Sequence, residues 1–350
     1  MTPGSANMPQ HEDISTPPPP RPLPIAPRYR TLRAIVWEYG ILAFVLAALI
    51  LFFGQTTDRF LTWTNFETLA NRTLPAPTIL AVGMTLVLII GGIDLSVGSV
   101  LGLSAAVLGV LVAVPERPGD VGCDLPLWIG VLACLGVGLL AGAANGAVVV
   151  RWGVPSFIVT LGMLEVARGL TYMLTQSRTA YIGLKIQPFA EASLGGMSLS
   201  FLIALAVVVL GQFLLSNTVF GRNLVALGCN EEAVRLSGIK VKPLRVTAFM
   251  LSGLLAALAA VIEVSKQQNA EPNAGKGYEL EAIAAVVIGG TSLMGGRGSV
   301  VGTFLGVMIM AVLSSGLTAM GAREEHKRVI TGAVIVVAVI LDGYRSRLRP

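Results

Sequence analysis

Long apolar runs recur along most of the chain and are separated by short polar segments. A helix needs about 20 apolar residues to cross a bilayer core about 30 Å thick, because each residue adds about 1.5 Å. By that length the sequence predicts an all-α integral membrane protein with about ten transmembrane helices. The predicted ranges are 35–53, 70–92, 94–114, 125–150, 154–175, 198–216, 244–264, 279–294, 299–320 and 327–343.

The composition favours the same class of protein. The chain has 350 residues, of which 54% are hydrophobic and only 13% are charged. Its mean hydropathy is +0.75, whereas a soluble domain carries about 25% charged residues. A soluble protein with a very large core is the alternative, but apolar runs of spanning length through the whole chain argue against it.

The ends and loops predict how the chain lies in the membrane. Residues 1–33 form a polar, proline-rich tail that we expect to be disordered, residues 34–343 the membrane domain, and residues 344–350 a basic tail. Basic residues gather in the 217–243 loop and in the C-terminal tail, and acidic ones in the 115–124 loop. The positive-inside rule then places both termini in the cytoplasm and agrees with ten crossings. Because the basic residues lie in short loops and termini, the net charge of +5 indicates membrane orientation rather than nucleic-acid binding.

Several kinds of chemistry lack the residues they need. The three cysteines have no metal-ligand spacing, and the two histidines, His11 and His326, lie in opposite flanks of the chain. The sequence therefore predicts no metal site, no cofactor and no histidine-based catalytic triad. It also contains no GxxxxGK[ST] phosphate loop, so we expect ATP hydrolysis, if any, on a separate subunit.

An internal echo predicts two related halves. The letters LIIGG at 88–92 are followed by GSV at 98–100, and VVIGG at 286–290 by GSV at 298–300. With six predicted helices between the copies, both face the same side, which indicates a parallel repeat. Small residues are common in membrane helices, so chance resemblance is the alternative.

The segment 91–98, with the letters GGIDLSVG, joins two apolar runs through a carboxylate. Irregular backbone and charge at membrane depth occur only against protein or a water-filled cavity, which makes a broken helix beside the translocation path one interpretation. A helix cap formed by the aspartate is the other, and the two are compatible. The candidate residues here are Gly92, Asp94, Ser96 and Gly98.

A second segment, inside the basic loop, predicts a short cytoplasmic helix. Asn230 is a plausible N-cap, and Gly238 can adopt the left-handed C-cap conformation. Such a helix suits docking into a partner's groove, and an ordinary solvated loop helix is the alternative. Its candidate residues are Asn230, Glu231, Glu232, Ala233, Arg235, Leu236, Ser237 and Gly238.

A third segment, 281–302, is rich in small residues that allow helices to approach closely. Lining a pore or a dimer seam is one interpretation and plain helix packing is the other. The candidate residues are Gly289, Gly290 and Gly298.

These segments, together with VPSFIVTLG at 154–162, resemble permeases of bacterial monosaccharide ABC importers of the ribose and xylose type, most closely ribose permeases. The resemblance covers about residues 70–343. It implies a transmembrane permease subunit of the inner membrane, in contact with lipid, that transports a sugar, a pentose such as ribose. It also implies a second permease copy, an ABC ATPase subunit that receives Glu231–Gly238 as the coupling helix, and a periplasmic sugar-binding protein.

The segment 176–197 departs from what we expect of a ribose permease, which weakens the inference of ribose itself. Two other classes of function stay open. An ion-coupled secondary transporter of a small polar solute would use Asp94 as its ion site. An intramembrane enzyme is disfavoured, because histidines and paired aspartates at membrane depth are missing.

Overall fold

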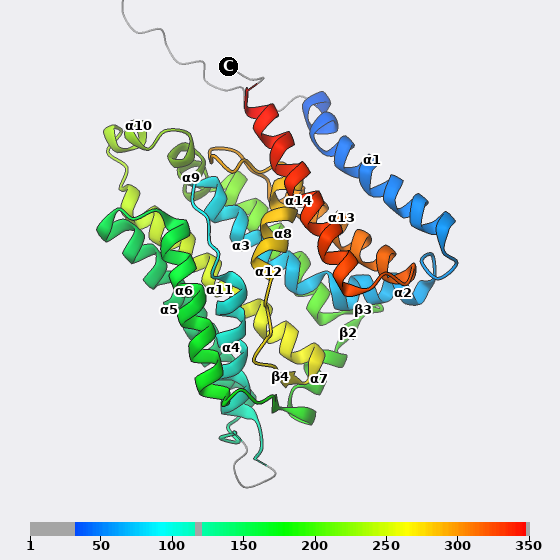
Figure 1. The fold of residues 1–350 in the computed structure, drawn as a ribbon. Coiled ribbons are helices and arrows are strands. Elements are labelled where there is room, and N and C mark those ends of the chain that lie inside the picture. Colours follow the sequence, from blue (N-terminus) through cyan, green and yellow to red (C-terminus); the bar gives the residue numbers. More distant parts are fainter. Residues whose placement is uncertain (1–31, 116–120, 348–350) are drawn as a thin grey trace, which may run out of the picture.

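The computed structural model describes residues 32–115 and 121–347 and is almost entirely helical (Figure 1). The proline-rich tail predicted for residues 1–33 lies almost wholly outside this part of the chain. The longer helices are α1 (Leu32–Thr56), α3 (Pro75–Ile89), α4 (Val97–Val112), α5 (Leu127–Trp152), α6 (Ser156–Thr175), α8 (Leu199–Asn217), α9 (Val219–Cys229), α11 (Val241–Gln267), α12 (Tyr278–Ile288), α13 (Val300–Ala319) and α14 (Glu324–Arg347). The shorter elements are α2 (Trp63–Thr68), η1 (Leu69–Thr73), β1 (Ala180–Tyr181), η2 (Gly183–Lys185), α7 (Gln187–Glu191), β2 (Ser193–Leu194), β3 (Met197–Ser198), α10 (Glu231–Leu236) and β4 (Asn269–Ala270).

Each of the ten predicted spans coincides with a helix, and the all-α membrane class is confirmed. Six helices of the described residues are long and apolar enough to cross a bilayer, and a bent pair raises the number to seven. The helices α4 and α12, with 16 and 11 residues, are shorter than a full span. The count of ten crossings is therefore not confirmed and stays a prediction.

Two of the helices predicted as continuous are interrupted in the structure. The 70–92 run contains a bend of 46° between Trp63–Thr73 and Pro75–Ile89. Prolines at 75 and 77 explain this bend, because proline has no N–H to donate and its ring clashes with the preceding turn. The 279–294 run ends as a helix at Ile288, where consecutive glycines begin.

Small residues bring the central helices together. Helix α11 runs through the middle of the molecule and packs against α3, α4 and α5 (Figure 1). An added Cβ at Gly142 of α5 would lie 2.2 Å from the Phe249 carbonyl oxygen, and one at Gly253 of α11 would lie 2.1 Å from that of Gly138. These helices therefore touch through their backbones, as small-residue membrane interfaces do.

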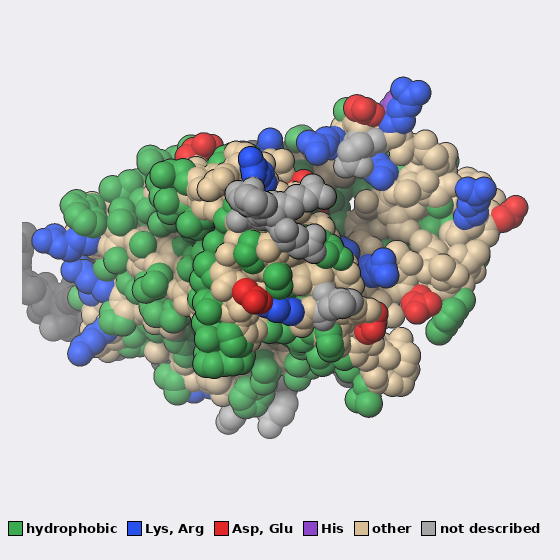
Figure 2. Space-filling model, turned by 90° about the horizontal axis from the view of Figure 1, so that it is seen from below, with side chains coloured by type: hydrophobic (Ala, Val, Ile, Leu, Met, Phe, Trp, Pro, Cys, Tyr) green, Lys and Arg blue, Asp and Glu red, His purple; other side chains and the backbone are tan. Residues whose placement is uncertain are grey.

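The two ends of the molecule differ. Helices α9 and α10 lie at the upper end in Figure 1, and α7 with the short strands lies toward the lower end. The hairpin β2–β3 turns through Gly195 and Gly196, both with positive φ, as a two-residue hairpin turn requires. Strand β1 pairs with β4, which ties the 176–197 segment to the end of α11. Seen from below, hydrophobic side chains cover much of the left of the molecule, and charged ones gather toward the right (Figure 2).

Candidate functional site

The first break in the helices begins where α3 ends. The amide of Gly91 donates to the Leu88 carbonyl (2.9 Å) and that of Gly92 to the Val87 carbonyl (3.0 Å), which is a Schellman helix end. Gly91, with φ of +73°, adopts the left-handed conformation this end requires. The glycine that turns the chain is thus Gly91, which precedes the predicted candidate Gly92. Gly98 lies inside α4, where an added Cβ would lie 2.3 Å from the Gly275 carbonyl oxygen.

Asp94 is buried in this break and accepts hydrogen bonds with both carboxylate oxygens. Its Oδ1 accepts from the Ser96 amide (3.0 Å) and hydroxyl (2.6 Å), and its Oδ2 accepts from the Ser252 hydroxyl of α11 (3.0 Å). The Asn145 amide of α5 donates in turn to Ser96 Oγ (2.9 Å). Asp94 thus holds Ser96, the residue before α4, and joins this turn to α11 and, through Ser96, to α5.

The irregular backbone beside Asp94 is satisfied by α6. The Ile93 amide donates to Ser156 Oγ (2.9 Å) and the Leu95 amide to Thr160 Oγ1 (3.0 Å). The Thr160 hydroxyl donates back to the Ile93 carbonyl (3.1 Å). Side chains therefore replace the missing helical bonds, as unwound backbone at membrane depth requires.

The second break, between α12 and α13, begins with the same helix end. The Gly290 amide donates to the Val287 carbonyl (2.9 Å), the Thr291 amide donates to the Val286 carbonyl (3.1 Å), and Gly290 has φ of +89°. Gly91 therefore corresponds to Gly290 in the structure. The alignment of LIIGG with VVIGG pairs Gly92 with Gly290 instead, so the structural correspondence is shifted by one residue. Helix α13 then starts after Ser299, whose hydroxyl accepts from the Gly302 amide (3.2 Å).

The remaining predicted glycines of this segment serve close packing. At Gly289, an added Cβ would lie 2.5 Å from the Gly302 carbonyl oxygen. At Gly298, it would lie 2.7 Å from Ile89 Cγ1. Gly295 and Gly296, which belong to the predicted small-residue segment but are not among its candidate residues, take positive φ in this break.

The two breaks and the end of α9 meet at one backbone junction. The Gly296 amide donates to the Ile89 carbonyl (2.8 Å), which links the second break to the end of α3. An added Cβ at Gly228, near the end of α9, would lie 1.8 Å from the Ile89 carbonyl oxygen and 2.4 Å from the Gly296 nitrogen. The next residue, Cys229, places its Sγ 3.5 Å from the Gly296 carbonyl oxygen. We call this contact of α3, α9 and the second break the Gly228 junction.

Helix α10 follows α9 directly and has the predicted caps. Asn230 Oδ1 accepts from the Ala233 amide (3.0 Å) at its start, and Gly238 has φ of +79° after its end. Its polar side chains pair locally, Glu232 with Arg235 (2.7 Å) and Glu231 with Arg245 (2.8 Å).

The apolar side chains of α10 divide between the molecule and solvent. Val234, which is not among the candidate residues, is buried, whereas Leu236 is 78% exposed. The hydrogen bond from Arg235 to Glu232, together with the negative charge of that carboxylate, raises the pKa of Arg235. A charged surface with one exposed leucine therefore projects from this end of the molecule.

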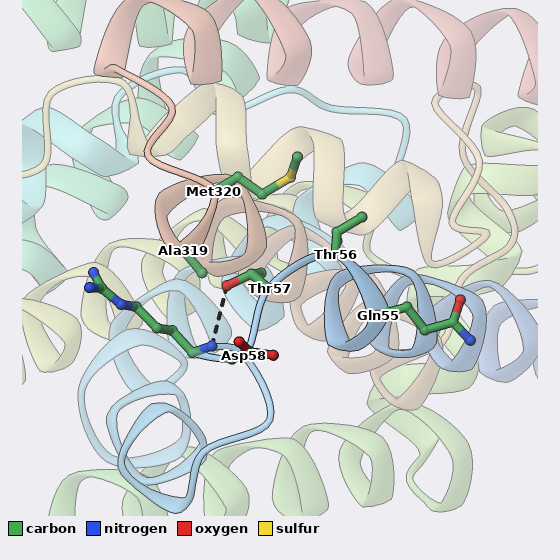
Figure 3. Close-up of a pocket in the computed structure, with 7 residues that line it drawn as sticks. Gln55, Thr56, Thr57, Asp58, Ala319 and Met320 are labelled. Atoms are coloured by element: carbon green, nitrogen blue, oxygen red, sulfur yellow. Dashed lines mark hydrogen bonds between the residues drawn. The ribbon is translucent and has the colours of Figure 1, made fainter.

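Two cavities in the described part of the chain lie away from the predicted site residues. The larger, of about 440 Å³, lies where α1 and α13 end and is lined by polar groups around Asp58 and Arg59 (Figure 3). The other, of about 90 Å³, lies between α3, α12 and α13. Within the described part of the chain no group of three or more His, Cys, Asp or Glu side chains could hold a metal ion.

The described chain has long apolar helices and two breaks between helices that contact each other. Helix α10 projects from the molecule and follows α9, which touches both breaks. These features define the class of a multi-pass membrane transport protein. The chain belongs to the family of permease components described as "Branched-chain amino acid transport system / permease component", whose model matches residues 69–339. It is therefore a transport subunit rather than an enzyme, as the sequence predicts.

Curated relatives carry the same class of name. The ribose import permease protein of Escherichia coli K12 is 37% identical over 91% of this chain and 97% of its own length. That of Bacillus subtilis is 41% identical over 77% and 81%, and the E. coli K12 xylose transport system permease protein is 32% identical over 93% and 96%. The predicted resemblance is confirmed. No solved structure matches the chain at a significant level.

Proposed function

We propose that the chain is the permease subunit of an ATP-driven importer that moves a monosaccharide, a pentose such as ribose, across the bacterial inner membrane into the cytoplasm. The observation that carries this proposal is the similarity to ribose import permeases, which extends over almost their whole length. The family description mentions branched-chain amino acids. The curated relatives that match in full length are sugar permeases, and this favours a sugar.

The ATPase partner would dock on α10. This helix projects from the molecule, is capped at both ends by its own residues and exposes Leu236. An apolar side chain surrounded by charged ones is a suitable anchor in a groove of a partner. ATP hydrolysis would then take place on that separate subunit, because this chain has no phosphate loop.

The Gly228 junction would transmit the movement of α10 to the breaks. Helix α9 leads into α10 and at the same time touches the end of α3 and the second break through backbone atoms. Because backbone atoms touch directly with no side chain between them, α9 cannot shift without moving its neighbours. A displacement of α9 would therefore displace both breaks. The breaks would lie beside the translocation path, and the predicted candidate residues would shape it: Gly92, Asp94, Ser96, Gly98, Gly289, Gly290 and Gly298.

Two further partners complete the importer. A second copy of the permease would form the pore with this one, and a periplasmic sugar-binding protein would deliver the sugar at the end opposite α10, where α7 and the short strands lie. Both termini would lie in the cytoplasm with the basic 217–243 loop, according to the positive-inside rule.

Purification of the tagged chain from its native membrane tests this proposal. We expect an ATP-hydrolysing subunit in stoichiometric amount, and its loss when residues 230–238 are scrambled. A chain that purifies alone and transports in vesicles without ATP would instead be a secondary transporter, in which Asp94 could hold the ion. Uptake of labelled ribose, xylose and leucine, each measured separately, then distinguishes the substrate classes, and uptake of leucine alone would refute the sugar.

A further inference from the structure

Helix α6 has one face that no other element of the described chain covers. Its 20 residues form a helix of spanning length that packs against α4 and α5. The buried side of α6 carries Thr160, Ala167, Thr171 and Thr175. The opposite side exposes Glu165 between Gly162 and Gly169, and an added Cβ at either glycine would meet no atom within 4 Å. Exposed apolar side chains, among them Leu161, Val166 and Leu170, flank these three residues.

Glu165 places a carboxylate at the middle of this exposed face. It is the tenth of the 20 residues of α6, so it lies near half the depth of the membrane. Among the described residues, no hydrogen bond or ion pair is formed by its carboxylate. Arg168, one turn further on, donates instead to the carbonyls of Pro272 (3.1 Å) and Ala274 (3.0 Å). A carboxylate at this depth is costly against lipid and is found where it faces water or a partner.

Further polar groups lie beyond Glu165, along one edge of this face. The Tyr172 hydroxyl of α6 donates to Asn273 Oδ1 (2.9 Å), on the segment that joins β4 to α12. Asn273 and Lys276 of that segment are exposed. Arg168 holds the segment in place through its hydrogen bonds to the two carbonyls. Gly275 packs closely against α4, because a Cβ added to it would lie 2.3 Å from the Gly98 carbonyl oxygen.

We infer that this face of α6, with Glu165 at its centre, lines the aqueous path of the transported solute. Glu165 accepts hydrogen bonds from the hydroxyl groups of a neutral, polyhydroxylated solute, and Tyr172, Asn273 and Lys276 supply further polar groups along the same edge. Carboxylate, phenol, amide and ammonium groups all form hydrogen bonds with hydroxyl groups. This inference rests on the proposed function, because it takes the solute to be a sugar.

A comparison of two helices at equal depth tests whether water reaches this face. Val209 is the eleventh of the 19 residues of α8 and is 60% exposed, so it is a matched position on another helix. Glu165→Cys and Val209→Cys are made in a chain that carries Cys123→Ser and Cys134→Ala, and the labelling of that parent chain at Cys229 is subtracted from both. Native membrane vesicles are then treated with a charged, membrane-impermeant methanethiosulfonate reagent.

We expect the cysteine at 165 to react at least tenfold faster than the cysteine at 209, because the reagent and the thiolate both require water. Equal rates, or no reaction at 165, would overturn the inference and assign this face to lipid or to a sealed seam with a second copy. The outcome does not depend on purification with an ATPase, so it can fail while the importer proposal holds.

The contribution of the carboxylate to transport is measured with Glu165→Gln and Glu165→Leu. Glutamine keeps an acceptor oxygen, so we expect uptake to fall less than threefold. Leucine removes the polar group, and uptake should fall at least tenfold with an unchanged amount of chain in the membrane. Uptake equal to wild type in Glu165→Leu would refute the role of Glu165.

Discussion

The two breaks in the helices begin alike and are held in different ways. Gly91 and Gly290 end α3 and α12 with the same pair of backbone hydrogen bonds. The first break is then filled by side chains, with Asp94 at the centre and hydroxyl groups from α6 on its backbone. The second break contains more glycine and presses its backbone against α3 and α9.

This difference indicates a division of roles. A network of buried hydrogen bonds has one favourable geometry, because every unpaired member is costly, so the first break is fixed in shape. Glycine has no Cβ and adopts conformations that other residues rarely adopt, so the second break can change its backbone conformation without rearranging side chains. The second break is thus the better candidate for the part that moves when α9 moves.

The largest effect is expected from Gly228→Ala, which places a methyl group inside the Gly228 junction. The new Cβ would lie 1.8 Å from the Ile89 carbonyl oxygen. Overpacking of this kind costs about 3 kcal/mol, the upper part of the usual range. We expect sugar uptake to fall at least tenfold, measured in vesicles with the amount of inserted chain as the reference.

Gly136→Ala in α5 is the matched control, because no atom lies within 4 Å of its added Cβ. It should leave uptake unchanged. Normal uptake in Gly228→Ala would show that the junction is loose and would remove it from the coupling route.

The first break is tested by replacing Asp94. Asp94→Ala removes the acceptor of Ser96 and Ser252, and hydrogen bonds to a charged group contribute about 1.5–3 kcal/mol. We expect a clear loss of thermal stability in detergent and a similar loss of uptake. Asp94→Asn keeps the oxygen that accepts from Ser96, and the Ser252 hydroxyl can turn to accept from the new amide, so the variant should keep most of its stability.

The Asp94→Asn result also separates the two interpretations of this residue. Wild-type stability with complete loss of uptake would mean that transport requires the charge, as an ion site would. Retained uptake would leave Asp94 as a cap and a tie between helices.

Features that depend on neighbours in sequence were predictable. Asn230 and Gly238 mark the ends of α10 because a cap is formed with residues only a few positions away. The positions of both breaks were recognisable for the same reason, since glycines and a carboxylate interrupt apolar runs. The bend before α3 was predictable from Pro75 and Pro77 as well, although the predicted helix 70–92 runs straight through it.

Features that depend on tertiary contacts were not predictable. Ser252 and Asn145 join the Asp94 network from helices far away in sequence, and an isolated serine or asparagine in an apolar run does not reveal its partner. Which glycine of a cluster takes positive φ is decided by where the last helical hydrogen bond forms. The sequence therefore predicts where the glycines gather but not that Gly91, Gly290 and Gly295 are the ones that take positive φ.

Equal effects are expected from Gly91→Ala and Gly290→Ala if the two breaks correspond. Both glycines are left-handed, with φ of +73° and +89°, and neither has an atom closer than 3.7 Å to an added Cβ. The cost for each is that of the conformation alone, about 1–2 kcal/mol. Thermal unfolding of the two variants measures it, and a difference of more than about 1 kcal/mol, comparable with that cost, would contradict the structural correspondence of Gly91 with Gly290.

The smallest effect on stability, and a specific one on coupling, is expected from Gly238→Val. Gly238 ends α10 with φ of +79° in open space, so valine meets no clash and only the conformation is strained. Because α10 projects from the molecule, thermal stability should stay near wild type, while the ATPase activity that accompanies uptake falls severalfold. Gly238→Asn is the control, since asparagine tolerates the left-handed conformation and should keep coupling. If valine and asparagine behave alike, the shape of this helix end does not matter for the partner, and the exposed Leu236 becomes the contact to replace next.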